Sequence, residues 1–102
     1  MGKMSRDKGA KYERELVNAF KDLGLSAQRV PLSGATNYAK GDVEVTAGFD
    51  GKTIFVGECK RRKNLPEWIV NALGENHFMA MRCDKGETLV MLRLGTFAEL
   101  LQ

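Results

Sequence analysis

The sequence predicts an α/β fold, a mixed five-stranded β-sheet flanked by α-helices. Two observations carry this prediction. Apolar residues recur at helical spacing near the N-terminus, and five short strand-like runs follow, separated by turn-forming residues. A chain of 102 residues suits one modest core, so we expect a single domain over residues 1–102.

The first predicted element is a helix over residues 5–23. Its apolar stripe consists of Tyr12, Leu16, Val17, Phe20 and Leu23. Gly24 is a typical helix stop. Glu13 lies three and four positions before two members of the stripe, so we expect it to border the buried face of the helix.

Three strands are predicted next, with a long loop between the first two. The first strand covers Ser26–Val30 and the second covers Asp42–Ala47. The residues between them are small and polar without apolar periodicity, which is typical of a functional loop. After a turn over residues 48–52, the third strand covers Thr53–Lys60. Its apolar run 54–56 predicts a central strand that is buried on both faces.

The remaining elements complete the order α-β-β-β-α-β-β-α. They are a helix over Glu67–Leu73, strands over His77–Arg82 and Thr88–Leu94, and a closing helical turn over Phe97–Leu101. Pro66 suits the first turn of the short helix, and Thr96 is a candidate cap of the closing turn. The apolar residues of the short helix, including Trp68 and Val70, exceed what seven residues need to bury, which favours contact with a second copy.

The positive charge is concentrated in the first part of the chain. Residues 1–63 hold 13 Lys and Arg against 8 Asp and Glu, whereas residues 64–102 hold 3 against 5. A basic surface around an acidic pocket suits a polyanionic substrate. The alternative is a charged surface that only keeps the protein soluble.

Membrane and secreted proteins are disfavoured. No apolar run reaches the ~20 residues of a membrane helix, and no secretory signal is visible, so we expect no membrane partner. Cys59 and Cys83 form neither a CxxC motif nor a zinc pattern, which indicates reduced thiols and a cytoplasmic location.

The candidate site combines Gly41-Asp42 with Glu58-Cys59-Lys60. Alternate residues of a strand share a face, so Glu58 and Lys60 should project together while Cys59 points toward the core. A hairpin would bring Asp42 close to Glu58. Two carboxylates suit a hard divalent cation such as Mg²⁺, and a lysine suits a developing phosphate charge. The combination indicates metal-dependent cleavage of nucleic acid.

Each candidate residue has an expected role. We expect Asp42 and Glu58 to supply the metal carboxylates and the backbone carbonyl of Cys59 to be a third ligand. Lys60 would stabilise transition-state charge or orient the attacking water. Glu13 would hold a second metal or a metal-bound water.

Simpler interpretations exist for each residue taken alone. Glu58 and Lys60 could form a cross-strand ion pair at an exposed edge, and Asp42 could be a turn residue. Glu13 could be ordinary surface charge on its helix. By strand alternation Glu44 shares the face of Asp42, so it could replace Asp42 as a ligand or be a solvated residue. The conjunction of the motifs favours the catalytic interpretation.

Several short motifs also occur in a characteristic order. They are Lys8-Gly9-Ala10-x-x-Glu13-Arg14-Glu15-Leu16, Gly24, Arg29 before a loop with Ser33-Gly34, Gly41-Asp42-Val43 and Glu58-Cys59-Lys60. Over residues 6–63 this pattern closely resembles the archaeal-type Holliday junction resolvases. That family belongs to the PD-(D/E)XK nuclease superfamily and has relatives in phages. This chain has Gly41 where the superfamily usually has proline.

The resemblance implies a restriction-endonuclease-like core and a structure-selective nuclease that resolves four-way DNA junctions. Glu13, Asp42, Glu58 and Lys60 match the family's catalytic residues, and Ser33 matches a loop serine near the scissile phosphate. The resemblance also implies Mg²⁺ as cofactor, with Mn²⁺ as a substitute and no small-molecule cofactor. The implied assembly is a homodimer that nicks opposed strands symmetrically.

Basic residues are the candidates for contacts with DNA phosphates. They are Lys3, Arg6, Lys8, Lys11, Arg14, Arg29, Lys40, Arg61, Arg62 and Lys63. Two rival functions remain open: another PD-(D/E)XK nuclease of the repair or restriction type, and a non-catalytic nucleic-acid-binding domain that keeps the fold.

Overall fold

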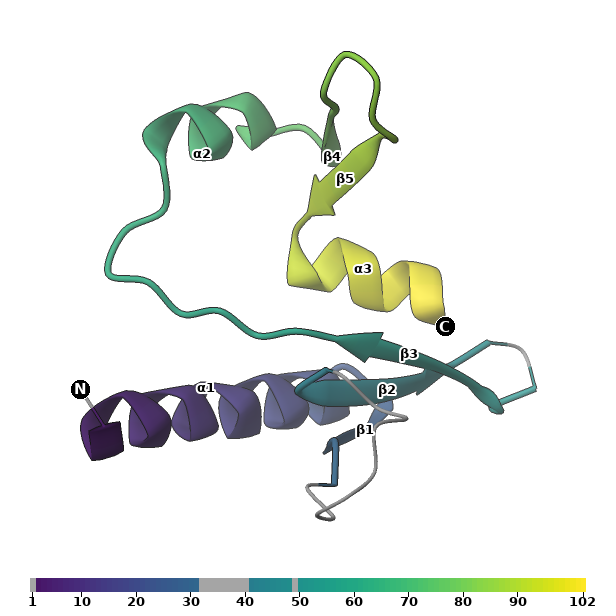
Figure 1. Ribbon diagram of the computed structural model, residues 1–102. Coiled ribbons are helices and arrows are strands. Elements are labelled where there is room, and N and C mark those ends of the chain that lie inside the picture. Colours follow the sequence, from purple (N-terminus) through teal and green to yellow (C-terminus); the bar gives the residue numbers. More distant parts are fainter. Residues whose placement is uncertain (1, 32–40, 49) are drawn as a thin grey trace. The chain divides into compact units, whose positions relative to one another are not determined.

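The computed structural model describes residues 2–31, 41–48 and 50–102, except for the side chains of residues 2–8. The chain falls into two compact units (Figure 1). The first comprises residues 1–61 together with the last two residues, and the second comprises residues 62–100. Whether these units form one domain, as the sequence predicts, stays a prediction.

The first unit consists of helix α1 (Gly2–Asp22) and an antiparallel sheet of three strands in the order β1-β2-β3. The strands are β1 (Ser26–Arg29), β2 (Val43–Ala47) and β3 (Thr53–Gly57). β2 lies in the middle because it pairs with β1 on one side and with β3 on the other. Arg29 lies opposite Val43, and Val43 lies opposite Gly57. The end of β1, the start of β2 and the end of β3 therefore lie side by side at one end of the sheet.

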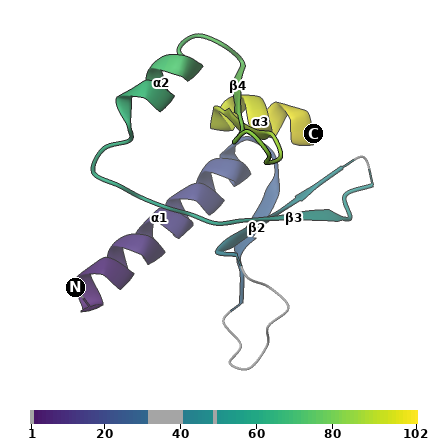
Figure 2. The same cartoon turned by 45° about the horizontal axis from the view of Figure 1, so that its top comes forward.

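The core of this unit lies between α1 and the central strand. α1 contacts β1 and β2 and runs along one side of the sheet (Figure 1 and Figure 2). Its Val17 and Phe20 are buried, as the predicted stripe requires, and alternate residues of β2 are buried opposite them. The helix ends at Asp22, before Gly24, whose φ of 91° is a left-handed conformation that favours glycine.

Two predictions for this unit need correction. α1 begins at Gly2, earlier than the predicted residue 5. β3 ends at Gly57 and is exposed along its whole length, with Ile54, Phe55 and Val56 at 55%, 46% and 51% exposure. The prediction that this run is central and buried is therefore wrong. β3 pairs only with β2 in this three-stranded sheet, which makes it an edge strand and not a central one. Its side chains stay exposed because α1 packs mainly on β1 and β2.

The second unit contains α2 (Glu67–Leu73), β4 (Phe78–Met81), β5 (Leu89–Leu92) and most of α3 (Leu94–Leu101). β4 and β5 form a two-stranded antiparallel sheet, and α2 contacts β4. A guanidinium nitrogen of Arg93 donates a hydrogen bond to the carbonyl of Gly74, which ties the end of α2 to the segment after β5.

The helices and strands were predicted in the correct order, but the arrangement of the sheets and the start of the last helix differ from the prediction. The described strands form two antiparallel sheets of three and two strands, and not one mixed sheet of five. α3 begins at Leu94, so Thr96 lies inside the helix and does not cap it. The amide of Phe97 donates to the carbonyl of Arg93 at 3.0 Å, which closes the first turn of the helix one residue before Leu94.

The last two residues of the chain belong to the first unit. The amide of Gly48, in the turn after β2, donates to the carbonyl of Leu101 at 3.2 Å, and the side chain of Gln102 donates to the carbonyl of Leu23. Within the described part of the chain, no helix is both long and apolar enough to cross a lipid bilayer.

Candidate functional site

Asp42 lies at the end of the sheet where all three strands of the first unit meet, and its backbone joins two of them. Its amide donates to the carbonyl of Gly57 at 2.9 Å, and its carbonyl accepts from the amide of Val30 at 3.0 Å. These bonds continue the ladders of β2 with β3 and with β1 by one residue. The backbone of Asp42 is therefore fixed between the ends of its two neighbouring strands.

The carboxylate of Asp42 is held as well. Its Oδ2 accepts a hydrogen bond of 2.7 Å from the amide of Cys59, on the segment that leaves β3. A short bond from a backbone amide to a carboxylate is charge-assisted and stronger than a neutral one. A carboxylate has several acceptor positions, so this bond leaves Asp42 capable of further interactions. The side chain is thus oriented while it keeps the capacity to bind another partner.

Glu13 is positioned by an ion pair between α1 and β1. Nε of Arg29 donates to Oε1 of Glu13 at 2.9 Å, and the two side chains are partly buried, at 38% and 20% exposure. Arg29 is predicted from the sequence as a phosphate contact. The structure shows that it also has an intramolecular partner, which orients one of the candidate carboxylates.

The thiol of Cys59 indicates how these acidic groups are distributed. Its pKa is raised, chiefly by burial, and then by the negative charges of Asp42, Glu13 and Glu58. Three of the predicted carboxylates therefore contribute to the negative potential at this thiol, although they come from α1, from the residue before β2 and from the segment after β3. The negative potential there is what a bound cation would offset.

Glu58 and Lys60 lie beyond the end of β3 and point into solvent, at 62% and 64% exposure. Their side chains approach each other, with Nζ of Lys60 3.6 Å from Oε2 of Glu58. An exposed pair of this kind adds little to stability. Its structural effect is to place an ammonium group beside the acidic centre.

Glu44 has a different partner from the candidate site. Its Oε1 accepts a hydrogen bond from the side-chain Nε2 of Gln28, which lies directly opposite it in the register of β1 and β2. The sequence left open whether Glu44 could take the place of Asp42. The structure places it in a cross-strand pair within the sheet, one pair away from the end where Asp42 lies.

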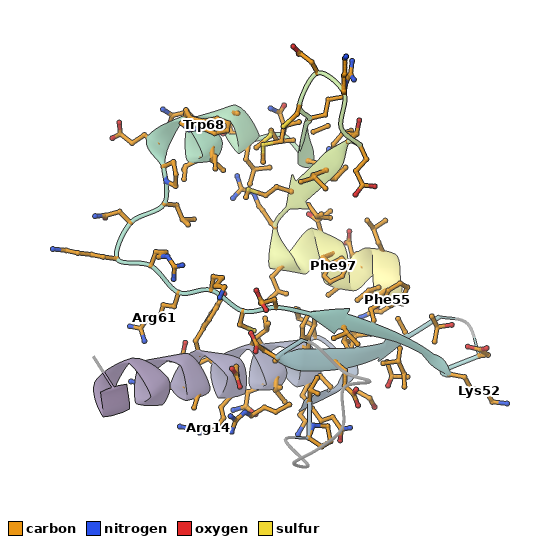
Figure 3. All side chains as sticks on the ribbon, viewed as in Figure 1. Arg14, Lys52, Phe55, Arg61, Trp68 and Phe97 are labelled. Carbon is orange, nitrogen blue, oxygen red and sulfur yellow. The ribbon has the colours of Figure 1, made fainter. Side chains whose placement is uncertain are left out.

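The other predicted residues are distributed over several segments. Arg14 on α1 and Arg61 after β3 extend from different elements of the first unit (Figure 3). Lys11 is also exposed on α1, whereas Arg62 and Lys63 belong to the second unit. Ser33, Lys40 and the side chains of Lys3, Arg6 and Lys8 lie outside the described residues.

The chemistry of the site fits Mg²⁺. Carboxylate oxygens from Asp42, Glu58 and Glu13 are the hard donors that this ion prefers, and the backbone carbonyl of Cys59 is another oxygen donor. Among the residues that the structure describes, no three His, Cys, Asp or Glu side chains already form a group able to hold a metal. The donor types and the shared negative potential at Cys59 support a cation site, while its coordination stays a prediction.

The negative electrostatic potential at Cys59 can be tested by alkylation of its thiol. Iodoacetamide at pH 8 is expected to modify the exposed Cys83 faster than Cys59, because a raised pKa leaves less reactive thiolate. Asp42→Asn should then accelerate the modification of Cys59 about twofold or more, since removing a negative charge lowers the pKa of the thiol. Mass spectrometry of the labelled peptides measures both rates. The rate at Cys83 serves as the control, and an unchanged rate at Cys59 would contradict the assignment.

Acidic side chains near one end of a sheet, bordered by arginine and lysine, are typical of a protein that acts on a polyanion. A comparison with protein-family models identifies the particular family. The model of the archaeal Holliday junction resolvases (Hjc) matches residues 4–95, which is most of the chain. The chain belongs to this family, and it is accordingly a nuclease of the Holliday junction resolvase type.

The match extends past residue 63, where the resemblance of the sequence motifs ends, and it includes most of the second unit. Searches of the curated proteins and of the solved structures found no match.

Proposed function

We propose that this protein is a Mg²⁺-dependent DNA endonuclease that resolves four-way junctions by paired symmetric nicks and acts as a homodimer. Family membership supports the class of reaction. The observation that carries the proposal further is the orientation of Asp42, whose carboxylate is bound by the amide of Cys59 at the end of the sheet. An acid held rigidly beside other acids and a lysine suits a metal-assisted hydrolysis.

Asp42, Glu58 and Glu13 are the residues that would hold the metal, together with the carbonyl of Cys59. When bound, Mg²⁺ supplies Lewis acidity at a phosphoryl oxygen and lowers the pKa of a bound water. Arg29 keeps Glu13 directed by their 2.9 Å ion pair. Lys60 supplies positive charge toward the non-bridging phosphoryl oxygens, where negative charge develops in the transition state.

Binding to DNA would rest on contacts with phosphates. Lys11 and Arg14 on α1, and Arg61 after β3, are exposed basic residues of the same unit as the acidic centre. The other predicted basic residues stay candidates. Contacts with phosphates give affinity that falls with salt but little base preference. Selectivity for a branched structure would therefore come from the spacing of basic surfaces, and not from reading bases.

The homodimer is supported by α2. None of its residues is buried, although four of its seven are large and apolar, and Trp68 and Val70 are 61% and 50% exposed. Such a surface would be stabilised by burial against a second copy. Two copies would bring two active sites to one junction, which paired nicking requires.

A cleavage assay tests this proposal. The substrates are a four-way junction, a linear duplex and a flap of matched sequence, each incubated with Mg²⁺, Mn²⁺ or EDTA. We expect symmetric nicks in the junction with either metal and no product with EDTA. Denaturing gels with each strand labelled in turn show whether the two nicks lie at equivalent positions.

The possible outcomes separate the rival functions. Equal cutting of junction and linear duplex would indicate a general nuclease of the repair or restriction type. Binding of the junction without cleavage in either metal would indicate a non-catalytic binding domain. A single nick per junction, together with a monomeric mass at micromolar concentration, would contradict the homodimer. The cytoplasmic location and the phage relationship stay predictions.

A further inference from the structure

Gly41, the residue before Asp42, approaches β3 so closely that no side chain fits there. A Cβ atom added at Gly41 would overlap Cγ1 of Val56 and would lie 3.0 Å from the carbonyl oxygen of Gly57. The same carbonyl accepts the hydrogen bond from the amide of Asp42 at 2.9 Å. The close approach of Gly41 and the bond of Asp42 therefore involve the same point of β3.

Of the two groups that face Gly41, the backbone carbonyl of Gly57 has little freedom to withdraw, whereas the side chain of Val56 is 51% exposed and can withdraw only by changing its rotamer. Val56 is β-branched, which restricts its χ1 torsion, and it lies within the β2–β3 ladder opposite Glu44. The carbonyl of Gly57 is backbone and is engaged by the amide of Asp42. A side chain at residue 41 would be accommodated mainly by moving residues 41–42 away from β3.

We propose that Gly41 is a positioning residue for Asp42, and that its missing side chain sets the orientation of the Asp42 carboxylate. This inference rests on the proposed function, in which Asp42 holds the metal. Displacement of Asp42 from β3 lengthens the bond to Gly57 and withdraws Oδ2 from the amide of Cys59.

Four variants test the proposal. Gly41→Ala introduces the obstruction, and Gly41→Ala combined with Val56→Ala removes the overlap with Cγ1. Val56→Ala alone shows the effect of truncating the valine. Gly57→Ala is the matched control, because a Cβ at Gly57 meets nothing within 4 Å although it lies on the same stretch of β3.

The first measurement is the single-turnover cleavage rate at saturating junction and Mg²⁺. Gly41→Ala should lower the rate by about 10²-fold, since a misplacement of the order of 1 Å can have that effect. The double variant should recover to within about tenfold of wild type, because the 3.0 Å approach to Gly57 remains. Gly57→Ala and Val56→Ala should each stay within about threefold of wild type.

The second measurement is hydrogen exchange of the Cys59 amide, followed by NMR without DNA or metal. Gly41→Ala should accelerate this exchange about tenfold or more, while the amides of β2 stay protected, and the double variant should restore protection. If Gly41→Ala alone fails to fold, the double variant decides: restored folding and protection support the proposal, and their absence overturns it.

The two measurements distinguish this inference from the proposed function. A wild-type protein that does not cleave would overturn the function, whereas the exchange of the Cys59 amide would still decide the role of Gly41. If Gly41→Ala cleaved the junction and exchanged its Cys59 amide at the wild-type rates, the inference would be overturned while the proposed function would stand. If Gly41→Ala lowered the cleavage rate and the added Val56→Ala of the double variant did not restore it, the inference would also be overturned, because it is based on the overlap between these two residues.

Discussion

Asp42→Asn is expected to lower junction cleavage by at least about 10³-fold while changing junction affinity by no more than about threefold. The amide keeps the shape of the side chain, and its oxygen can still accept the hydrogen bond from the amide of Cys59. It lacks the negative charge that a divalent cation requires. The variant should therefore fold and bind DNA but fail to cleave. Single-turnover rates and a binding titration in Ca²⁺ measure the two properties separately.

Asp50→Asn is the matched control for this variant. Asp50 lies in the hairpin turn of the same unit, where its carboxylate accepts a bond from the amide of Lys52 at 2.9 Å. The same chemical change at that position should leave cleavage within about twofold of wild type.

Glu58→Gln should behave like Asp42→Asn, with cleavage strongly lowered and junction affinity nearly unchanged. Cleavage near the wild-type rate in either variant would remove that residue from the metal site.

Arg29→Ala is expected to lower the cleavage rate about 10²-fold at saturating junction, because Glu13 loses the partner that orients it. Arg29→Lys keeps the positive charge but cannot reproduce the Nε–H donor, so an intermediate rate should result. A loss of phosphate contact alone would instead weaken binding and reduce the salt slope by about one, and saturation would restore the rate.

Arg14→Ala provides the comparison for Arg29. Arg14 is the neighbour of Glu13 on α1 and is exposed, so its loss should act mainly on junction affinity. Affinity measured across a salt series, together with the rate at saturation, separates the two roles. If Arg29→Ala and Arg14→Ala proved indistinguishable in both measurements, the positioning role of Arg29 would be wrong.

Local sequence patterns were enough to predict most helices and strands. The helical stripe that contains Val17 and Phe20 predicted both α1 and its buried face, and helix Glu67–Leu73 was predicted with its observed bounds. The number and pairing of the sheets could not be predicted in this way. The run Ile54–Val56 has the composition of a buried central strand, but its environment depends on which strands pair with it. Pairing is a long-range property that no local pattern contains.

The candidate site also combines features that local sequence patterns predict with features that depend on the pairing of strands. Strand alternation predicted that Glu58 and Lys60 project together, and the structure has them as an ion pair. They lie beyond the end of β3, however, so strand alternation is not what brings them together. The bond from the amide of Cys59 to Asp42 and the pairing of Gln28 with Glu44 depend on register. A shift of one residue would send every side chain to the opposite face, so neither contact follows from composition.

The bond between Asp42 and Cys59 has an evolutionary consequence. One oxygen of Asp42 serves the fold and the carboxylate as a whole serves the proposed chemistry. Selection for the chemistry would preserve the acid, whereas selection for the fold alone would preserve either an acid or an amide at this position. A descendant that had ceased to cut DNA would still lose stability on replacing Asp42 by alanine, because the amide of Cys59 would lose its acceptor. Retention of an acid or an amide at position 42 is therefore a weak record of activity, and Glu58, whose exposed ion pair adds little to stability, records it better.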